Sequence, residues 1–222
     1  MATTSLLHRG RARLEEALAR VGLLHTLSLA RLRLHRGLEA AIANHARGRC
    51  LDAGSGRSPY REMLAARATE VVSVDVEDRS GRVDLIADVQ EMPQVESGTF
   101  DTVLCTQVIE HVPRPWDALA ELARVLAPGG TLVLTAPHLS VVHEAPHDFY
   151  RYTKYGLASL CERSGLEVVE VSPTGGLLTF LGHGASAALM STLGVVPLLR
   201  WPVWLVNYAL LVQLLGVFDR VV

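Results

Sequence analysis

Short apolar runs alternate with helical stretches over residues 49–173, and this alternation constrains the fold of the chain more than any other feature. Such a pattern is typical of a parallel sheet covered by helices on both faces. It predicts a doubly wound, mostly parallel α/β domain. The predicted strands are residues 49–53, 71–76, 85–87, 102–106, 131–135 and 167–172, and the predicted helices are residues 60–68, 116–126 and 153–164.

The segments that flank this region have a different character, so the chain divides into residues 1–48, 49–173 and 174–222. Residues 1–48 place Leu14, Leu18 and Val21 at helical spacing, which predicts one or two amphipathic helices. Residues 1–49 hold nine arginines against three glutamates, a charge of +6, whereas the whole chain carries −2. We interpret the arginines as the solvated face of a helix, with contact to an anionic surface as the alternative. The overall balance disfavours nucleic acid as a partner.

The last fifty residues form an apolar helical extension. Residues 173–199 and 201–218 contain no Asp, Glu, Lys or Arg, and prolines and Arg200 separate the two runs. Two interpretations remain open, because periodicity does not separate a buried helix from a membrane helix. The helices are either buried against the domain or a partner, or they form a hairpin at a bilayer with Trp201 and Trp204 near the interface.

Cysteine usage bears on the compartment of the protein. Cys50, Cys105 and Cys161 are odd in number and far apart, which favours a reduced protein over a disulfide scaffold. The first eleven residues lack the apolar core and cleavage site of a signal peptide. We therefore expect a cytoplasmic protein, with membrane association as an open alternative.

A glycine-rich segment at the end of the first predicted strand is the first candidate binding site. Gly54 and Gly56 follow Asp52 where a strand should pass into a helix, and glycines there let the backbone turn sharply and approach a nucleotide. Pro59 stands where a dinucleotide fingerprint has its third glycine, which favours a nucleoside without pyrophosphate. Asp75, nineteen residues beyond Gly56, can accept hydrogen bonds from ribose hydroxyls, although a helix cap or loop charge is the alternative. The fold is thus predicted to be Rossmann-like.

The order of later motifs is more specific than any one of them. An Asp88 before Met-Pro, Phe100-Asp101 ahead of an apolar strand, Glu110-His111, and a Leu-Ala-Pro-Gly-Gly stretch ending at residue 130 follow the glycine loop. Together they resemble the class I S-adenosylmethionine-dependent methyltransferases, small-molecule branch (type 11-like), over roughly residues 49–173. The resemblance implies a cofactor site built from Asp52, Gly54, Gly56, Asp75, Asp88, Val89 and Gln107.

Within that family, each of these residues has an expected role. The glycine loop with Asp52 would touch the methionine moiety and the ribose, and Asp75 would hold the ribose hydroxyls. Asp88, with the Val89 backbone beside it, would bind the adenine amino group, and Gln107 would approach the sulfonium. The sequence departs from the family at Ser58, which replaces a frequent third glycine, and it lacks an obvious seventh strand. Either an apolar stretch replaces that strand, or helices cover the edge of a six-stranded sheet.

The loop after the fifth predicted strand is the expected wall of the acceptor site. It carries His138, His143 and His147, and it admits three interpretations: a general base, a metal site, or a structural loop. In the structural interpretation Asp148 pairs with Arg151 and Thr153 caps the next helix. The histidine spacing matches no specific metal template, so we predict no metal. We name His147 and His143 as the candidate catalytic bases, with His111 as a positional residue.

The sequence therefore predicts an enzyme that transfers a methyl group from S-adenosylmethionine to a small-molecule or lipid-linked acceptor. Since a sulfonium already carries a good leaving group, placing the acceptor and excluding water supply most of the acceleration. Two other hypotheses are a membrane-associated scaffold that keeps the fold without catalysis and a nicotinamide-dependent oxidoreductase. Pro59 and Asp88 disfavour the oxidoreductase. The acceptor and the oligomeric state are left open.

Overall fold

The computed structural model describes residues 14–18, 21–194, 196 and 198–219. The chain forms two compact units. The first, Glu39–Val171, contains the sheet and is called the sheet unit. The second combines Met1–Leu38 with Ser172–Val222 and is called the helical unit. The two ends of the chain, separate in sequence, thus belong to one unit.

The sheet unit is built on five parallel strands among the residues described. They are β1 (Arg49–Ala53), β2 (Glu70–Asp75), β3 (Leu85–Ile86), β4 (Phe100–Thr106) and β5 (Leu126–Thr135), in the order β3-β2-β1-β4-β5. The order reverses between β1 and β4, where Cys50 pairs with Thr102 and Ala53 with Cys105. This arrangement confirms the predicted Rossmann-like α/β fold, and it puts the ends of β1 and β4 at a topological switch point.

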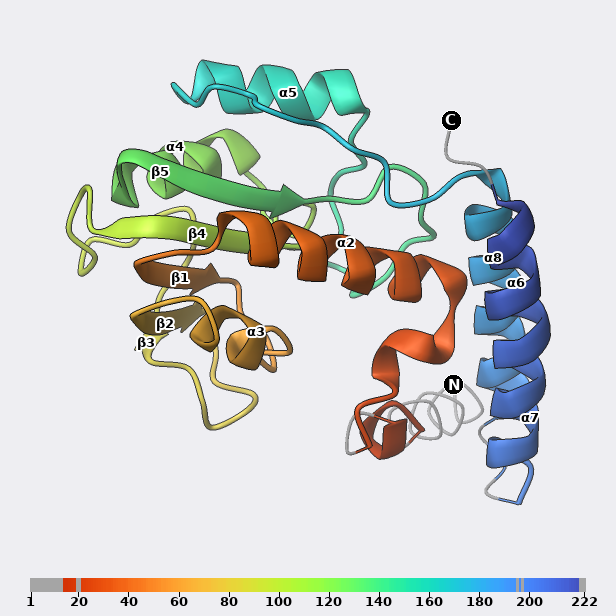
Figure 1. Cartoon of the computed structure of the whole chain (residues 1–222). Helices are drawn as coiled ribbons and strands as arrows, with labels where there is room; N and C mark the ends of the chain where they lie inside the picture. Colours follow the sequence, from red (N-terminus) through yellow and green to blue (C-terminus); the bar gives the residue numbers. More distant parts are fainter. Residues whose placement is uncertain (1–13, 19–20, 195, 197, 220–222) are drawn as a thin grey trace. The chain divides into compact units, whose positions relative to one another are not determined.

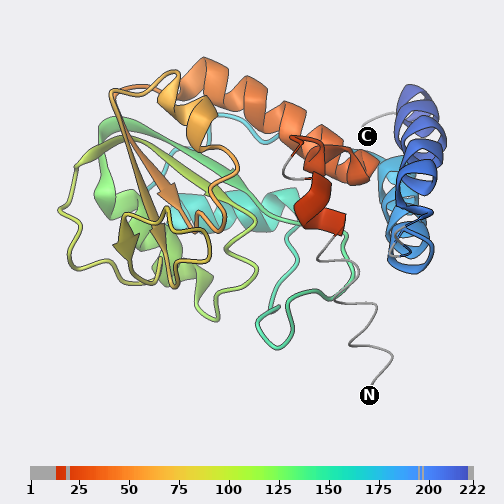
Figure 2. The ribbon, with the colours of Figure 1, turned by 90° about the horizontal axis from the view of Figure 1, so that it is seen from below.

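Helices cover both faces of the sheet, as the alternation predicts. α3 (Arg61–Ala65) and the end of α2 (Leu29–His45) lie on one face, and α4 (Pro115–Val125) and α5 (Lys154–Arg163) on the other (Figures 1 and 2). α4 begins with Pro115 in its first turn, where a missing N–H costs nothing. It buries Leu119 and Leu122 one turn apart on the face toward the sheet.

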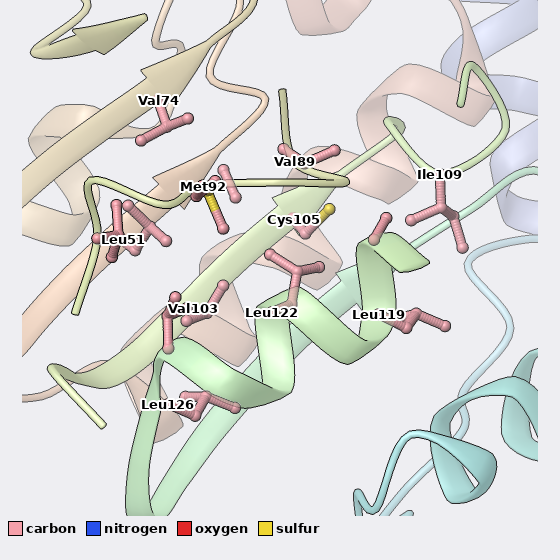
Figure 3. Packing of buried hydrophobic residues seen from close by; sticks show 14 of the residues in the cluster. Leu51, Val74, Val89, Met92, Val103, Cys105, Ile109, Leu119, Leu122 and Leu126 are labelled. Carbon is pink, nitrogen blue, oxygen red and sulfur yellow. The ribbon is translucent and has the colours of Figure 1, made fainter. Parts of the chain in front are cut away.

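The core lies between the strands and α4. Figure 3 shows Val103 and Cys105 of β4 beside Leu122 of α4, and Leu51 and Leu119 belong to the same buried cluster. Val89 and Met92, from the loop after β3, are 3% and 0% exposed and close the same core. Burial of these two side chains fixes the loop that carries Asp88. The thiols of Cys50 and Cys105 are buried and free in the described part of the chain.

The prediction of a sixth strand is wrong. Residues 167–172 form neither helix nor strand, and Val169 is 86% exposed. A strand needs a partner ladder and a buried face, and this segment has neither in the described structure. Of the two alternatives for the seventh strand, replacement by an apolar stretch is wrong, since residues 177–192 and 200–218 are helical.

The helical unit contains η1 (Leu24–Leu27), the first part of α2, α6 (Leu177–Thr192), α7 (Arg200–Val206), the π-helical η2 (Asn207–Leu214) and α8 (Leu215–Phe218). Helical residues 14–18 contribute Leu14 and Leu18 to a cluster with Leu27 and Met190. Of the arginines in the basic segment, Arg31 pairs with Glu15 at 3.0 Å and Arg33 with Asp219 at 3.3 Å. Arg9, Arg11, Arg13, Arg20 and the segment tested for a signal peptide lie outside the described residues.

Candidate active site

The glycine loop leaves β1 in a conformation that glycine alone adopts without strain. Gly54 has φ +71°, and a Cβ there would lie 2.4 Å from Cγ2 of Val108. Gly56 has φ +56°, and a Cβ there would meet no described atom within 4 Å. The backbone N–H of Gly56 donates to Oδ2 of Asp75 over 2.7 Å. The loop is therefore packed closely on one side and open on the other, beside Asp75.

Asp52 stands under this loop as a buried carboxylic acid. The residue is 3% exposed, and its Oδ2 finds no hydrogen-bond partner among the described residues. Burial raises the pKa of Asp52 to about 7, with the charge of Asp75 acting in the same direction and that of Arg61 against it. The hydroxyls of Ser55 and Ser58 are also buried without a partner in the described structure. These groups fit a ligand that brings several hydrogen-bond donors.

Asp88 and Val89 occupy the first turn beyond β3. Both oxygens of the exposed Asp88 accept hydrogen bonds from Gln90, one from the backbone N–H and one from the side-chain amide, at 2.9 Å each. Val89 is buried in the core, so its backbone is held in place. A carboxylate displayed on a fixed turn is suited to bind an amino group.

Gln107 follows β4 in a left-handed conformation, with φ +54°. Its backbone N–H donates to the carbonyl of Thr135 at 3.0 Å, and its side-chain amide to the Thr135 hydroxyl at 3.2 Å. The ends of β4 and β5 are thus joined through this residue. Asp52, Asp75 and Gln107 follow or end β1, β2 and β4, which are neighbours in the sheet, while Asp88 lies past the next strand outward.

The loop of residues 136–153 is held by the contacts that the structural interpretation predicts. Arg151 donates to both oxygens of Asp148, at 2.6 and 2.8 Å. The pKa of Asp148 is held well below its ordinary value, chiefly by this guanidinium and then by the backbone N–H of His143. Thr153 accepts from the N–H of Gly156 at 3.0 Å and caps α5. A rigid loop results.

The histidines of this loop differ in their surroundings. Nδ1 of His143 lies 3.5 Å from Oδ2 of Asp148, and the His143 ring meets that of His111 edge to face at 4.8 Å. His147 is exposed, and its backbone carbonyl contacts Nδ1 of His111 at 2.6 Å. Nδ1 of His138 contacts the carbonyl of Tyr152 at 3.0 Å. The structure thus brings His143 and His111 together and leaves the His147 side chain apart.

Glu110 is a candidate functional residue to which the sequence assigned no role. It is 0% exposed, its two carboxylate oxygens have no hydrogen-bond partner among the described residues, and Oε1 lies 3.8 Å from Nε2 of His111. Burial raises the pKa of Glu110 to about 7. Such perturbed groups gather at functional sites. The signal in the sequence was an acid four residues beyond the end of β4, but its burial is visible only in the tertiary structure.

Glu110, His111 and His143 also form a group that offers ligand atoms to a cation. Their ligand atoms lie within 4.8 Å of one another. The prediction made from the sequence rests on the spacing of His138, His143 and His147, and it does not include this combination of residues. The absence of a metal stays a prediction.

The fold and these residues can be compared with those of known domains. Five parallel strands in the order β3-β2-β1-β4-β5, a glycine loop after β1, and acidic residues within β1 (Asp52), at the end of β2 (Asp75) and after β3 (Asp88) agree with the arrangement that the sequence resemblance implies. Residues 51–134, from β1 to β5, match the family model described as a methyltransferase domain. Over this stretch the chain is similar to methyltransferase domains, in agreement with the resemblance that the sequence shows.

Curated relatives carry methyltransferase names. The ubiquinone biosynthesis O-methyltransferase of Aromatoleum aromaticum is 28% identical over 153 residues, which are 55% of this chain and 65% of the relative. The protein of the same name from Xanthomonas oryzae pv. oryzae is 30% identical over 125 residues, which are 50% of this chain and 51% of the relative. The chain thus matches between half and two thirds of the length of these relatives.

Solved structures support the fold. A SAM-dependent methyltransferase from Thermotoga maritima superposes with a TM-score of 0.53 at 19% identity, covering 70% of this chain and 81% of that one. The cyclase SpnF superposes with a TM-score of 0.54 at 20% identity, covering 78% and 74%. Because the second neighbour is named a cyclase, the shared fold does not by itself define the reaction.

Proposed function

We propose that this chain transfers the methyl group of S-adenosylmethionine to an oxygen atom of a small-molecule acceptor. The observation that carries the proposal is the presence of two carboxylates on neighbouring strands, that of Asp52 in β1 and that of Asp75 at the end of β2. Asp52 is buried with an unpartnered oxygen, and Asp75 is bonded to the N–H of Gly56 at the open side of the loop. The methyltransferase domain match over residues 51–134 supports the same cofactor.

Each candidate cofactor residue has a part in this proposal. Asp52 with Gly54 and Gly56 binds the methionine end and the ribose, and Asp75 accepts hydrogen bonds from the ribose hydroxyls. Asp88, beside the Val89 backbone, binds the adenine amino group, and Gln107 lies toward the sulfonium. A side chain at position 54 would strike Val108, so the loop needs glycine there whether or not a ligand is bound.

S-adenosylmethionine supplies a methyl group on a positively charged sulfur. The residues of this chain position the acceptor, exclude water and remove a proton if the acceptor is a hydroxyl. Of the two candidate bases, His143 is favoured because Asp148 lies 3.5 Å from its Nδ1 and can orient the ring. His147, whose side chain is exposed, is the alternative base. Glu110 and His111 lie next to His143 and can accept the proton in turn.

The acceptor class is inferred from the relatives. Two of them are named for O-methyl transfer in ubiquinone biosynthesis, which supports a hydroxyl acceptor and is consistent with a lipid-linked one. Free thiols at Cys50, Cys105 and Cys161 are consistent with a reducing, intracellular compartment.

Calorimetric titration with S-adenosylmethionine and with its demethylated product tests the proposal. Wild-type protein should bind both ligands, and Asp75→Ala should weaken binding at least tenfold, because a charge-assisted hydrogen bond contributes about 1.5–3 kcal/mol. Glu77→Ala is the matched control, since Glu77 is an exposed acid in the same loop and pairs with Arg79. Wild-type protein that is folded but binds neither ligand would refute the proposal and leave the scaffold hypothesis.

A further inference from the structure

The two long helices of the helical unit bury small and polar residues and expose large apolar ones. α6 lies alongside the continuous helix of α7, η2 and α8 (Figure 1), and we call these the apolar helix pair. The buried positions of α6 are Thr179, Gly182, Ser186 and Met190. In a helix of a water-soluble domain the large apolar side chains are the ones that face inward. Small and hydroxyl residues between helices are typical of packing in lipid.

The outward side chains of the pair form an extensive apolar surface. Helix Arg200–Phe218 has 19 residues and a mean hydropathy of 1.6, and only 11% of it is buried. At about 1.5 Å per residue it is about 28 Å long, close to the hydrocarbon thickness of a bilayer. Exposed large side chains occur along both helices: Leu177, Phe180, Leu181, Trp201, Leu205, Val206, Leu210, Leu214, Val217 and Phe218.

Several polar side chains of the pair are bonded inside the helical unit instead of turning outward. The amide of Asn207 donates to the carbonyl of Leu27 at 3.0 Å, and the indole N–H of Trp204 to the hydroxyl of Thr26 at 3.1 Å. Ser28 and His183 are 2.8 Å apart. These groups therefore do not require water on the apolar surface.

The ends of the pair are held together at a charged cluster. Asp219, directly after α8, accepts hydrogen bonds from the backbone N–H groups of Gly176 and Thr179 at 3.0 and 3.1 Å. It also pairs with Arg33 of α2 at 3.3 Å. The carboxylate thereby caps α6 and anchors α8, while the eighteen residues before it carry no charge.

The charge of the helical unit is opposite to that of the sheet unit. By sequence, Met1–Leu38 and Ser172–Val222 hold nine arginines against three acidic residues, a net charge of +6. Glu39–Val171 carries the remaining −8. Basic residues beside an apolar surface are attracted to anionic lipids, each contributing about 1 kcal/mol near the surface. The sheet unit, which binds the cofactor in the proposed function, is therefore acidic, whereas the helical unit is basic and apolar.

From these observations we propose that the apolar helix pair docks the protein onto an anionic lipid bilayer. The outward Leu, Val, Phe and Trp side chains enter the hydrocarbon, and the net positive charge of the same unit, counted over its sequence, favours an anionic surface. This docking does not depend on methyl transfer, because it uses residues outside the candidate active site.

Flotation with lipid vesicles tests this proposal on the full chain. Wild-type protein should float with vesicles of equal parts phosphatidylcholine and phosphatidylglycerol, more strongly than with phosphatidylcholine alone and less strongly at high salt. The double variant Leu205→Gln and Leu214→Gln should bind at least tenfold more weakly. Ile86→Gln with Val169→Gln is the matched control, because it changes two exposed apolar residues of the sheet unit and should float like wild type.

A fluorescence measurement locates the contact. In a Trp116→Phe background only Trp201 and Trp204 remain, and bromine-labelled lipid chains should quench them when vesicles are added. Folded wild-type protein that stays in solution with both vesicle types would overturn the proposal. So would a stable dimer in buffer that the Leu205→Gln and Leu214→Gln variant dissociates, because a second copy would then cover the surface. Circular dichroism checks that each variant is folded.

Discussion

The backbone N–H of Gly56 donates to Oδ2 of Asp75 over 2.7 Å, so the glycine loop after β1 is bonded directly to the end of β2. This bond joins residues nineteen positions apart and sets the open side of the loop against a carboxylate. Gly54 is under a different constraint, because it is packed against the side chain of Val108. The two glycines should therefore respond differently to substitution.

Gly54→Ala should destabilise the protein strongly, and Gly56→Ala only weakly. The added methyl group at position 54 would overlap Val108, and overpacking costs about 1–3 kcal/mol beyond the strain of a positive φ. At position 56 only that strain applies, about 1–2 kcal/mol. Urea denaturation without ligand measures both. Equal losses of unfolding free energy in the two variants would contradict the packing argument.

Gly56→Ala should nevertheless reduce cofactor binding more than its loss of stability explains. A methyl group there enters the open space beside Asp75, where the proposed ligand lies. Calorimetric titration of folded Gly56→Ala with S-adenosylmethionine should show at least tenfold weaker binding. Gly81→Ala is the control, because Gly81 also has a positive φ with no described atom near its Cβ but lies away from the strand ends.

Asp52 should make stability depend on pH between about 4 and 7. Its folded pKa, about 7, lies above the ordinary value of 3.8, so the folded state holds the proton more tightly than the unfolded chain. Its contribution is fully present below pH 3.8 and is lost as pH rises through about 7. Asp52→Asn removes this loss, so the variant should match wild type at low pH and exceed it above pH 7 by on the order of 4 kcal/mol. Urea denaturation at several pH values checks this, and parallel curves for the two proteins would contradict it.

Arg151→Met should loosen the acceptor loop. The side chain of Asp148 is 2% exposed and would lose its main partner, and an unpaired buried carboxylate costs about 3 kcal/mol. Thermal unfolding and limited proteolysis of residues 138–152 measure the effect. The double variant Asp148→Asn and Arg151→Met should recover part of the lost stability, because no charge is left unpaired. A double variant less stable than Arg151→Met alone would count against the pairing.

Asp219→Ala should destabilise the helical unit by about 2 kcal/mol, because it removes a helix cap and an ion pair together. Asp219→Asn keeps an oxygen that can accept from Gly176, so its loss should be smaller. Circular dichroism on heating gives the stability, and calorimetry with S-adenosylmethionine should show unchanged binding in both variants. Weaker cofactor binding would mean that this cluster also supports the sheet unit.

The sequence by itself determined the sheet domain and the residues at its strand ends. Runs such as residues 49–53 and 102–106 are mainly apolar because both faces of a central parallel strand are buried, and that composition is visible without coordinates. The order of the glycine loop, Asp75, Asp88 and Gln107 likewise follows from where strands end. These features depend on local chain chemistry, so the sequence carries them.

Tertiary structure decided what depends on partners distant in the chain. Residues 167–172 alternate like a strand but have no neighbouring ladder, so they remain irregular. Glu110 is a buried acid in the tertiary structure, where the loop of residues 136–153 is bonded to it through the N–H of Phe149, which donates to the Glu110 carbonyl. Which side of α6 faces inward was also decided by tertiary packing, which buries Thr179, Gly182 and Ser186 and leaves large apolar side chains of the same helix exposed.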